Sequence, residues 1–130
     1  MKYLLDTDTA SYFLRGNPNL RKRLSNTLGQ WGISAITHSE LAAHLFKTNS
    51  SALEGILAEF LKDVETVPFV RSDALEAGRL RALLEKAGTP IGPADTLIAG
   101  HALSLGVTLV TNNIKHFSKV PGLQIANWSD

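Results

Sequence analysis

Five short runs of apolar and β-branched residues alternate along the chain with longer segments in which apolar positions recur every three or four residues. The short runs are typical of strands buried in a sheet, and the longer segments are typical of amphipathic helices. Strands that alternate with helices predict a mainly parallel sheet with helices on both faces, a three-layer α/β/α sandwich. The predicted strands are residues 2–6, 32–36, about 66–69, 107–111 and 123–126.

The helical patterns fill the gaps between these strands. No internal repeat, low-complexity segment or glycine- and serine-rich linker divides the chain, so residues 1–130 are predicted to form one domain. The expected helices follow Asp6, open at residues 37–40, cover 53–64 and 74–84, and begin again at 92–95 after the break at 88–90.

Composition narrows the possible classes of protein. A hydrophobic content of 44% over 130 residues is enough for one real core. The absence of cysteine excludes disulfides, thiolate zinc sites and cysteine nucleophiles. No apolar run approaches the length of about 20 residues that a membrane span needs, and we expect a soluble, cytoplasmic protein. The chain also lacks the histidine spacing of zinc proteases, the serine elbow of hydrolases and the glycine-rich phosphate loop.

Three acidic residues stand where an apolar run gives way to a helix: Asp6, Glu40 and Asp95. The carboxyl ends of parallel strands share one edge of the sheet, so residues at these junctions can converge although they are distant in sequence. Carboxylates that lie close together repel one another, and a hard divalent cation with oxygen ligands relieves the repulsion. The placement therefore predicts one site for Mg²⁺ or Mn²⁺.

Each acid also has a simpler structural explanation. Asp6 is suited to cap the helix that follows it. Glu40 stands three residues after Thr37, the spacing of a capping box, and is expected in the first turn of its helix. Asp95 can complement the dipole of a helix that opens at Pro93. Capping alone, however, does not require that all three acids follow strands of the sheet.

Four motifs, in order along the chain, resemble those of the PIN-domain ribonucleases, and most closely the VapC toxins of bacterial toxin-antitoxin pairs. The resemblance runs from end to end. Its carriers are Tyr3-Leu4-Leu5-Asp6-Thr7, Ile36-Thr37-x-x-Glu40-Leu41, residues 92–99, and residues 109–113 followed by Phe117, Val120-Pro121-Gly122-Leu123 and Asn127-Trp128.

This resemblance implies a PIN-like fold and a metal-dependent endoribonuclease that inhibits translation by hydrolysing a structured RNA such as tRNA or rRNA. The metal would be Mg²⁺, with Mn²⁺ as an alternative. The implied partner is a cognate antitoxin that also binds DNA. A homodimer, a dimer of dimers or a larger complex with the antitoxin is expected, with self-association through the apolar surface of the helices at residues 39–64.

The resemblance also assigns roles to individual residues. Asp6 and Asp95 are expected to coordinate the metal, and Glu40 to orient or deprotonate the attacking water. Asn113 stands where the family often has aspartate, and we expect it to bind a metal-bound water or a phosphate. His116 stands where the family often has an acid; with Lys115 it is expected to contact RNA phosphate. Asp8, at a position where many relatives carry asparagine, is a secondary candidate in the acidic cluster.

Two other functions are compatible with parts of the pattern. A catalytically inactive PIN-like binding module would keep the fold without the chemistry, and the neutral Asn113 and His116 favour that alternative. A receiver-type signalling domain is also a small α/β protein with acids at strand ends. The receiver fits less well, because the chain has Asp6-Thr7-Asp8 instead of adjacent acids and Asn112-Asn113 instead of a closing lysine.

Overall fold

The computed structural model describes residues 1–130 and contains a five-stranded sheet in which every neighbouring pair of strands is parallel. The strand order is β3-β2-β1-β4-β5. The first strand is therefore the centre of the sheet, with Leu4 opposite both Gly32 and Leu109. The strands are β1 (Tyr3–Leu5), β2 (Trp31–Ser34), β3 (Glu65–Val67), β4 (Thr108–Val110) and β5 (Ile125–Ala126).

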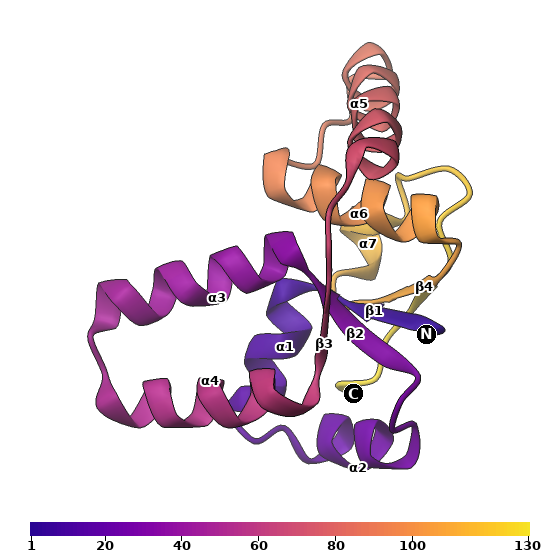
Figure 1. Ribbon diagram of the computed structural model, residues 1–130. Coiled ribbons are helices and arrows are strands. Elements are labelled where there is room, and N and C mark those ends of the chain that lie inside the picture. Colours follow the sequence, from indigo (N-terminus) through magenta and orange to yellow (C-terminus); the bar gives the residue numbers. More distant parts are fainter.

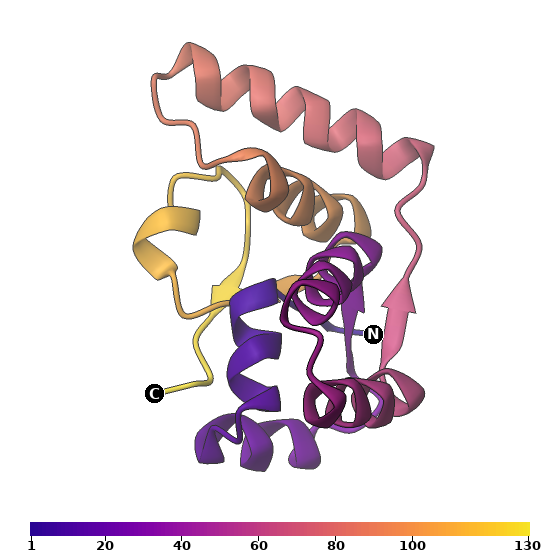
Figure 2. The same cartoon turned by 90° about the vertical axis from the view of Figure 1, so that its left-hand side faces the viewer.

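Seven helices surround the sheet and complete the predicted three-layer α/β/α fold (Figures 1 and 2). None of them is both long enough and apolar enough to cross a membrane. They are α1 (Thr7–Leu14), α2 (Pro18–Asn26), α3 (Ala35–Thr48), α4 (Ser51–Asp63), α5 (Arg71–Lys86), α6 (Pro93–Leu105) and α7 (Ile114–Phe117).

The alternation of side chains along the central strand divides the core into two halves. Leu4 packs with residues of α5, α6 and α7, whereas Leu5 packs with residues of α1, α2, α3 and α4. Successive residues of a strand point to opposite faces, so this separation follows from the backbone itself. In Figure 2 the pair α5 and α6 lies on one side of the sheet, and α1, α2 and α4 lie on the other.

The structure corrects the predicted strand at residues 32–36. This strand ends at Ser34, and Ala35 and Ile36 already belong to α3. The hydroxyl oxygen of Ser34 accepts a hydrogen bond from the Ile36 N–H at 3.0 Å, which satisfies a free amide of the first turn. Local capping therefore starts the helix earlier than the apolar pattern suggests.

The apolar pattern between residues 39 and 64 belongs to two helices joined by a tight reversal. Asn49 ends α3 in the left-handed conformation, with φ 53° and ψ 33°, and Ser50 caps α4. Asparagine tolerates this conformation better than most residues. As a result α3 and α4 lie side by side as an antiparallel hairpin (Figure 1).

The close packing of α5 against α6 depends on one glycine. A Cβ atom added at Gly100 would lie 2.5 Å from the Cα atom of Ala77, which is backbone and cannot swing away. The two helices therefore approach each other more closely than a larger residue would permit. This contact holds α6, and with it Asp95, against the rest of that layer.

We expect Gly100→Ala to destabilise the protein by about 1–3 kcal/mol, because the added methyl group overpacks the contact with α5. Gly78→Ala on α5 is a matched control, since a Cβ atom there meets nothing within 4 Å. That control is expected to gain up to about 1 kcal/mol from helix propensity. Urea unfolding of both variants measures the difference, and equal effects would contradict the close approach.

Candidate active site

The junctions between strands and helices enclose an acidic cavity of about 330 Å³. It contains all four acidic residues that the sequence predicts to cluster, and they come from three separate stretches of chain. The residues that line it are Asp6, Thr7, Asp8, Glu40, Gly92, Pro93, Ala94 and Asp95.

Asp6 is the most buried of these acids, with 3% of its surface exposed. Its Oδ1 accepts a hydrogen bond from the Thr9 N–H at 2.8 Å, so it caps α1 and also lines the cavity. Its own N–H donates to the carbonyl of Val110 on β4. Burial raises the pKa of Asp6 despite hydrogen bonds from Thr111 and Thr9, and the nearby charge of Asp8 raises it further.

Asp95 lies in the first turn of α6, as the sequence predicts. Its Oδ2 lies 3.0 Å from Nε2 of His116, which stands on α7. Burial raises the pKa of Asp95, His116 acts in the opposite direction, and the charge of Asp8 raises the pKa further. The His116 side chain therefore lies beside the acidic cavity, in contact with Asp95.

Glu40 is not in the first turn of its helix, and the expected capping box with Thr37 is wrong, because Ser34 caps α3. Instead the Thr7 hydroxyl donates a hydrogen bond to Oε1 of Glu40. Since the single Thr7 proton is used there, the hydroxyl of Thr37, 3.0 Å from that of Thr7, acts as the donor to Thr7. Two hydroxyls thus hold the Glu40 carboxylate toward the start of α1.

The remaining predicted residues lie outside the cavity lining. Asn113 is exposed at the start of α7, where its N–H donates to the hydroxyl of Thr111, and its side chain makes no capping hydrogen bond. Lys115 is also exposed on α7. The threonines at positions 7, 37 and 111 support the site; all three lie within the recognised motifs, but the sequence does not reveal their contacts.

The donor set suits a hard divalent cation, because it consists of carboxylates with two raised pKa values around one cavity. A bound cation would offset the repulsion that Asp8 exerts on Asp6 and on Asp95. No three acidic or histidine side chains, however, are already gathered closely enough to hold one ion. A metal would therefore have to draw these carboxylates together.

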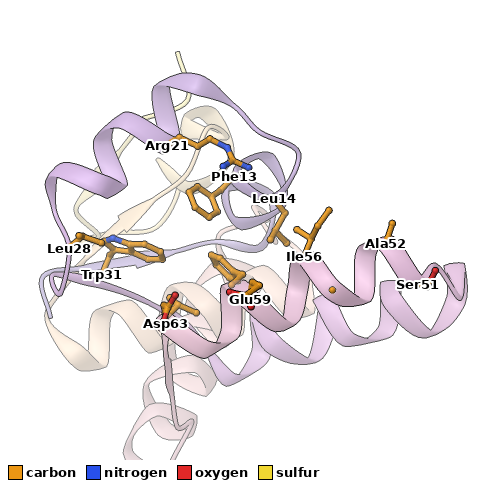
Figure 3. Close-up of a pocket in the computed structure, with 13 residues that line it drawn as sticks. Phe13, Leu14, Arg21, Leu28, Trp31, Ser51, Ala52, Ile56, Glu59 and Asp63 are labelled. Atoms are coloured by element: carbon orange, nitrogen blue, oxygen red, sulfur yellow. The ribbon is translucent and has the colours of Figure 1, made fainter.

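A second concave surface lies away from the acids, between α4 and the segment that contains α1 and α2 (Figure 3). This apolar groove has a volume of about 760 Å³. Figure 3 shows Phe13, Leu14, Leu28, Trp31, Ala52 and Ile56 around it, with Arg21, Glu59 and Asp63 as the charged residues.

A PIN-domain family model matches residues 3–123, nearly the whole chain. The chain belongs to the PIN-domain family. The VapC protein of Salmonella typhimurium, named a tRNA(fMet)-specific endonuclease, is 35% identical in an alignment of 134 positions that covers 98% of each chain. The protein of the same name from Shigella flexneri is 33% identical over 99% of each chain. These identities confirm the predicted resemblance to VapC proteins.

A solved structure agrees with this assignment to the PIN-domain family. The crystal structure of DNA-bound VapBC from Salmonella typhimurium contains a chain that is 37% identical and superposes with a TM-score of 0.91. The match covers 98% of this chain and 98% of that one. The predicted fold class is therefore confirmed.

We expect Asp6→Asn to stabilise the protein in the absence of divalent metal at neutral pH. The folded state raises the pKa of Asp6, so ionisation of this carboxyl opposes folding once the pH exceeds the pKa of the unfolded chain. Asparagine removes that charge and still caps the helix. Below about pH 3, under the pKa of an unperturbed aspartate, both states of the wild-type protein are protonated and the gain should disappear.

Thermal unfolding in EDTA at both pH values measures this effect. Glu59→Gln, which changes an exposed carboxylate on α4, is the control and should show no comparable gain. A variant Asp6→Asn that is less stable than wild type at neutral pH would contradict the buried charge as the cause.

Proposed function

We propose that this PIN domain is a metal-dependent endoribonuclease, a VapC-type toxin that inhibits translation and is controlled by a cognate antitoxin. The observation that carries the proposal is the convergence of Asp6, Asp8, Glu40 and Asp95 on one cavity. Membership of a family whose matched relatives are named endonucleases supports it. An inactive binding module would have no need for a partly buried acidic cluster whose charges oppose one another.

Asp6 and Asp95 are the residues proposed to hold Mg²⁺ or Mn²⁺. A bound divalent cation would neutralise charge that builds on the phosphate oxygens and lower the pKa of a water molecule toward neutrality. Asp6 is fixed by its cap to α1, and Asp95 by its contact with His116. These contacts reduce the freedom of both carboxylates before RNA binds.

Glu40 is proposed to orient or deprotonate the attacking water. One of its oxygens is occupied by the Thr7 hydroxyl, which leaves the other free to accept a hydrogen bond. A general base needs a fixed position within hydrogen-bond reach of its proton. Thr7 and Thr37 supply that position.

The RNA-facing residues are proposed from their place beside the cavity. Lys115 and His116 both lie on α7, and His116 reaches Asp95. Lys115 would contact phosphate through its charge, and exposed Asn113 would bind phosphate or water at the start of the same helix. The names of the two relatives specify tRNA(fMet), and we propose that initiator tRNA is the substrate here as well.

Purified protein is expected to cut initiator tRNA into discrete fragments with Mg²⁺ or Mn²⁺, and not with EDTA. Asp6→Asn and Asp95→Asn should each lower kcat/KM by roughly 100-fold or more, because each removes a proposed ligand of the cation that would neutralise charge in the transition state. Glu59→Gln is the control variant and should cleave normally. An elongator tRNA with the same terminal sequences tests whether the protein distinguishes initiator tRNA from other tRNA species.

Three results would contradict parts of this function. Cleavage that persists in Asp6→Asn would remove the acidic cavity as the site of chemistry. Protein that binds Mn²⁺ but cleaves none of the tRNA species would favour the binding module. Equal cleavage of initiator and elongator tRNA would contradict only the proposed substrate.

The apolar groove is proposed as the surface that the antitoxin covers. A groove of this volume, lined mainly by apolar and aromatic residues, leaves hydrophobic surface in water unless a partner buries it. Phe13, Trp31 and Phe60 give it a rigid aromatic wall, with ring centroids 5.4–6.2 Å apart. An amphipathic segment of the antitoxin would place its apolar side chains against this wall.

We expect Ile56→Lys, at a half-exposed position in the groove, to weaken antitoxin binding by about 10-fold or more, because a charge replaces a buried apolar contact. Leu75→Lys on α5 is the matched control, since Leu75 is exposed outside the groove. Calorimetry with the cognate antitoxin measures both. Unchanged binding by Ile56→Lys would contradict this docking surface.

Self-association stays a separate prediction. The exposed Phe46 on α3 offers apolar surface within the predicted range of residues 39–64. Analytical ultracentrifugation of the free protein at micromolar concentration tests it, and a monomer would contradict the predicted dimer.

A further inference from the structure

Three buried polar side chains form a chain across the interior, and none of them lines the acidic cavity. Ser34 and His101 have no exposed surface, and Asp73 has 3%. The His101 Nδ1 atom lies 2.8 Å from the Ser34 hydroxyl, and its Nε2 atom lies 3.6 Å from Oδ2 of Asp73. Buried polar groups are costly unless they are paired, so this arrangement needs a reason.

The neighbours of His101 favour one position for the imidazole proton. The Ser34 oxygen already accepts from the Ile36 N–H, and its proton is free to be donated to His101. Nδ1 of His101 is then the acceptor, and the ring proton sits on Nε2, facing Asp73. Burial lowers the pKa of His101, while Asp73 and the Pro68 carbonyl act in the opposite direction, so the neutral ring is favoured near neutral pH.

Asp73 lies at the other end of this set of buried polar side chains and is held by hydrogen bonds. Its Oδ2 accepts from the Val70 N–H at 2.8 Å, at the start of α5. Desolvation disfavours the charged form of Asp73, but Val70, the Ser104 hydroxyl and His101 outweigh it and lower its pKa. The Nε2 atom of His101 makes no hydrogen bond, and the charge that it faces, at 3.6 Å, is that of Asp73.

This set of buried polar side chains joins two of the helices that carry site residues. Ser34 caps α3 within two turns of Glu40, and His101 is on α6 within two turns of Asp95. Ser34 meets His101 while Glu40 shares the cavity with Asp95, so the two helices run in opposite directions over this stretch. A shift of α3 along α6 would break the Ser34 bond and change the separation of Glu40 and Asp95.

We infer that His101 is a positioning residue, which through Ser34 sets the place of Glu40 relative to Asp95. This inference rests on the proposed metal-dependent function. The link to Ser34 does the positioning, and Asp73 holds the ring in the tautomer that can accept from Ser34. Residues that hold metal ligands in position commonly affect metal affinity as well as activity when they are substituted.

Two substitutions of His101 separate these contacts. In His101→Asn the amide oxygen can take the place of Nδ1 and accept from Ser34, but nothing reaches Asp73. In His101→Gln the amide nitrogen can take the place of Nε2 and face Asp73, but Ser34 loses its acceptor. Because His101→Asn deletes more atoms and removes the N–H that faces Asp73, we expect it to be the less stable variant.

The test measures Mn²⁺ affinity by electron paramagnetic resonance, kcat and KM on tRNA, and thermal unfolding of each variant. We expect His101→Gln to lower Mn²⁺ affinity and kcat by roughly 10-fold or more. His101→Asn should keep both near wild-type values despite its lower stability. Nitrogen-15 NMR of the wild-type protein should show a neutral His101 ring with its proton on Nε2.

Several outcomes would overturn the inference. Losses of metal affinity that follow the order of thermal stability, or equal metal affinity in all three proteins, would leave His101 with a structural role only. A ring proton on Nδ1 would reverse the direction of the hydrogen bond with Ser34 and contradict the role of Asp73 in setting the tautomer. Wild-type protein that neither binds Mn²⁺ nor cleaves RNA would instead contradict the proposed function, and the positioning role would fail with it.

Discussion

The burial of a carboxylate at the end of the central strand is the constraint on which the rest of the site depends. Asp6 follows β1, bonds through its backbone to β4 and caps α1 through its side chain. A charge so placed is unfavourable unless hydrogen bonds or a cation compensate it, and burial raises its pKa accordingly. The buried charge therefore lowers stability at a position where the proposed function needs an anionic ligand, as is common at functional sites.

The supporting contacts show how neutral groups organise this charge. Thr7 and Thr37 hold Glu40, His116 holds Asp95, and the buried chain of Ser34 and His101 ties α3 to α6. The supports are mostly hydroxyls and imidazoles, which make hydrogen bonds without adding negative charge. The same cavity can therefore keep its carboxylates in place while it stays attractive to a cation.

Much of the architecture was predictable because it follows from local patterns. All five strands exist near their predicted positions, and Asp95 lies in the first turn of its helix. The errors are also local in origin. The spacing of Glu40 from Thr37 suggests a first-turn position, because the apolar pattern does not reveal that Ser34 already caps α3. The supporting partners were not predictable, because Thr7 reaches Glu40 and His116 reaches Asp95 only after distant segments fold together.

By itself, the sequence determined the alternation of strands and helices, the acids at three of their junctions and the motifs that resemble PIN domains, because each is encoded in neighbouring residues. The tertiary structure decided which of those residues share a cavity. It brought Asp6, Asp8, Glu40 and Asp95 together and left Asn113 exposed outside the lining. The order of strands in the sheet and the packing of α3 against α6 set the distances between residues that are far apart in the sequence. A local sequence pattern encodes neither of them.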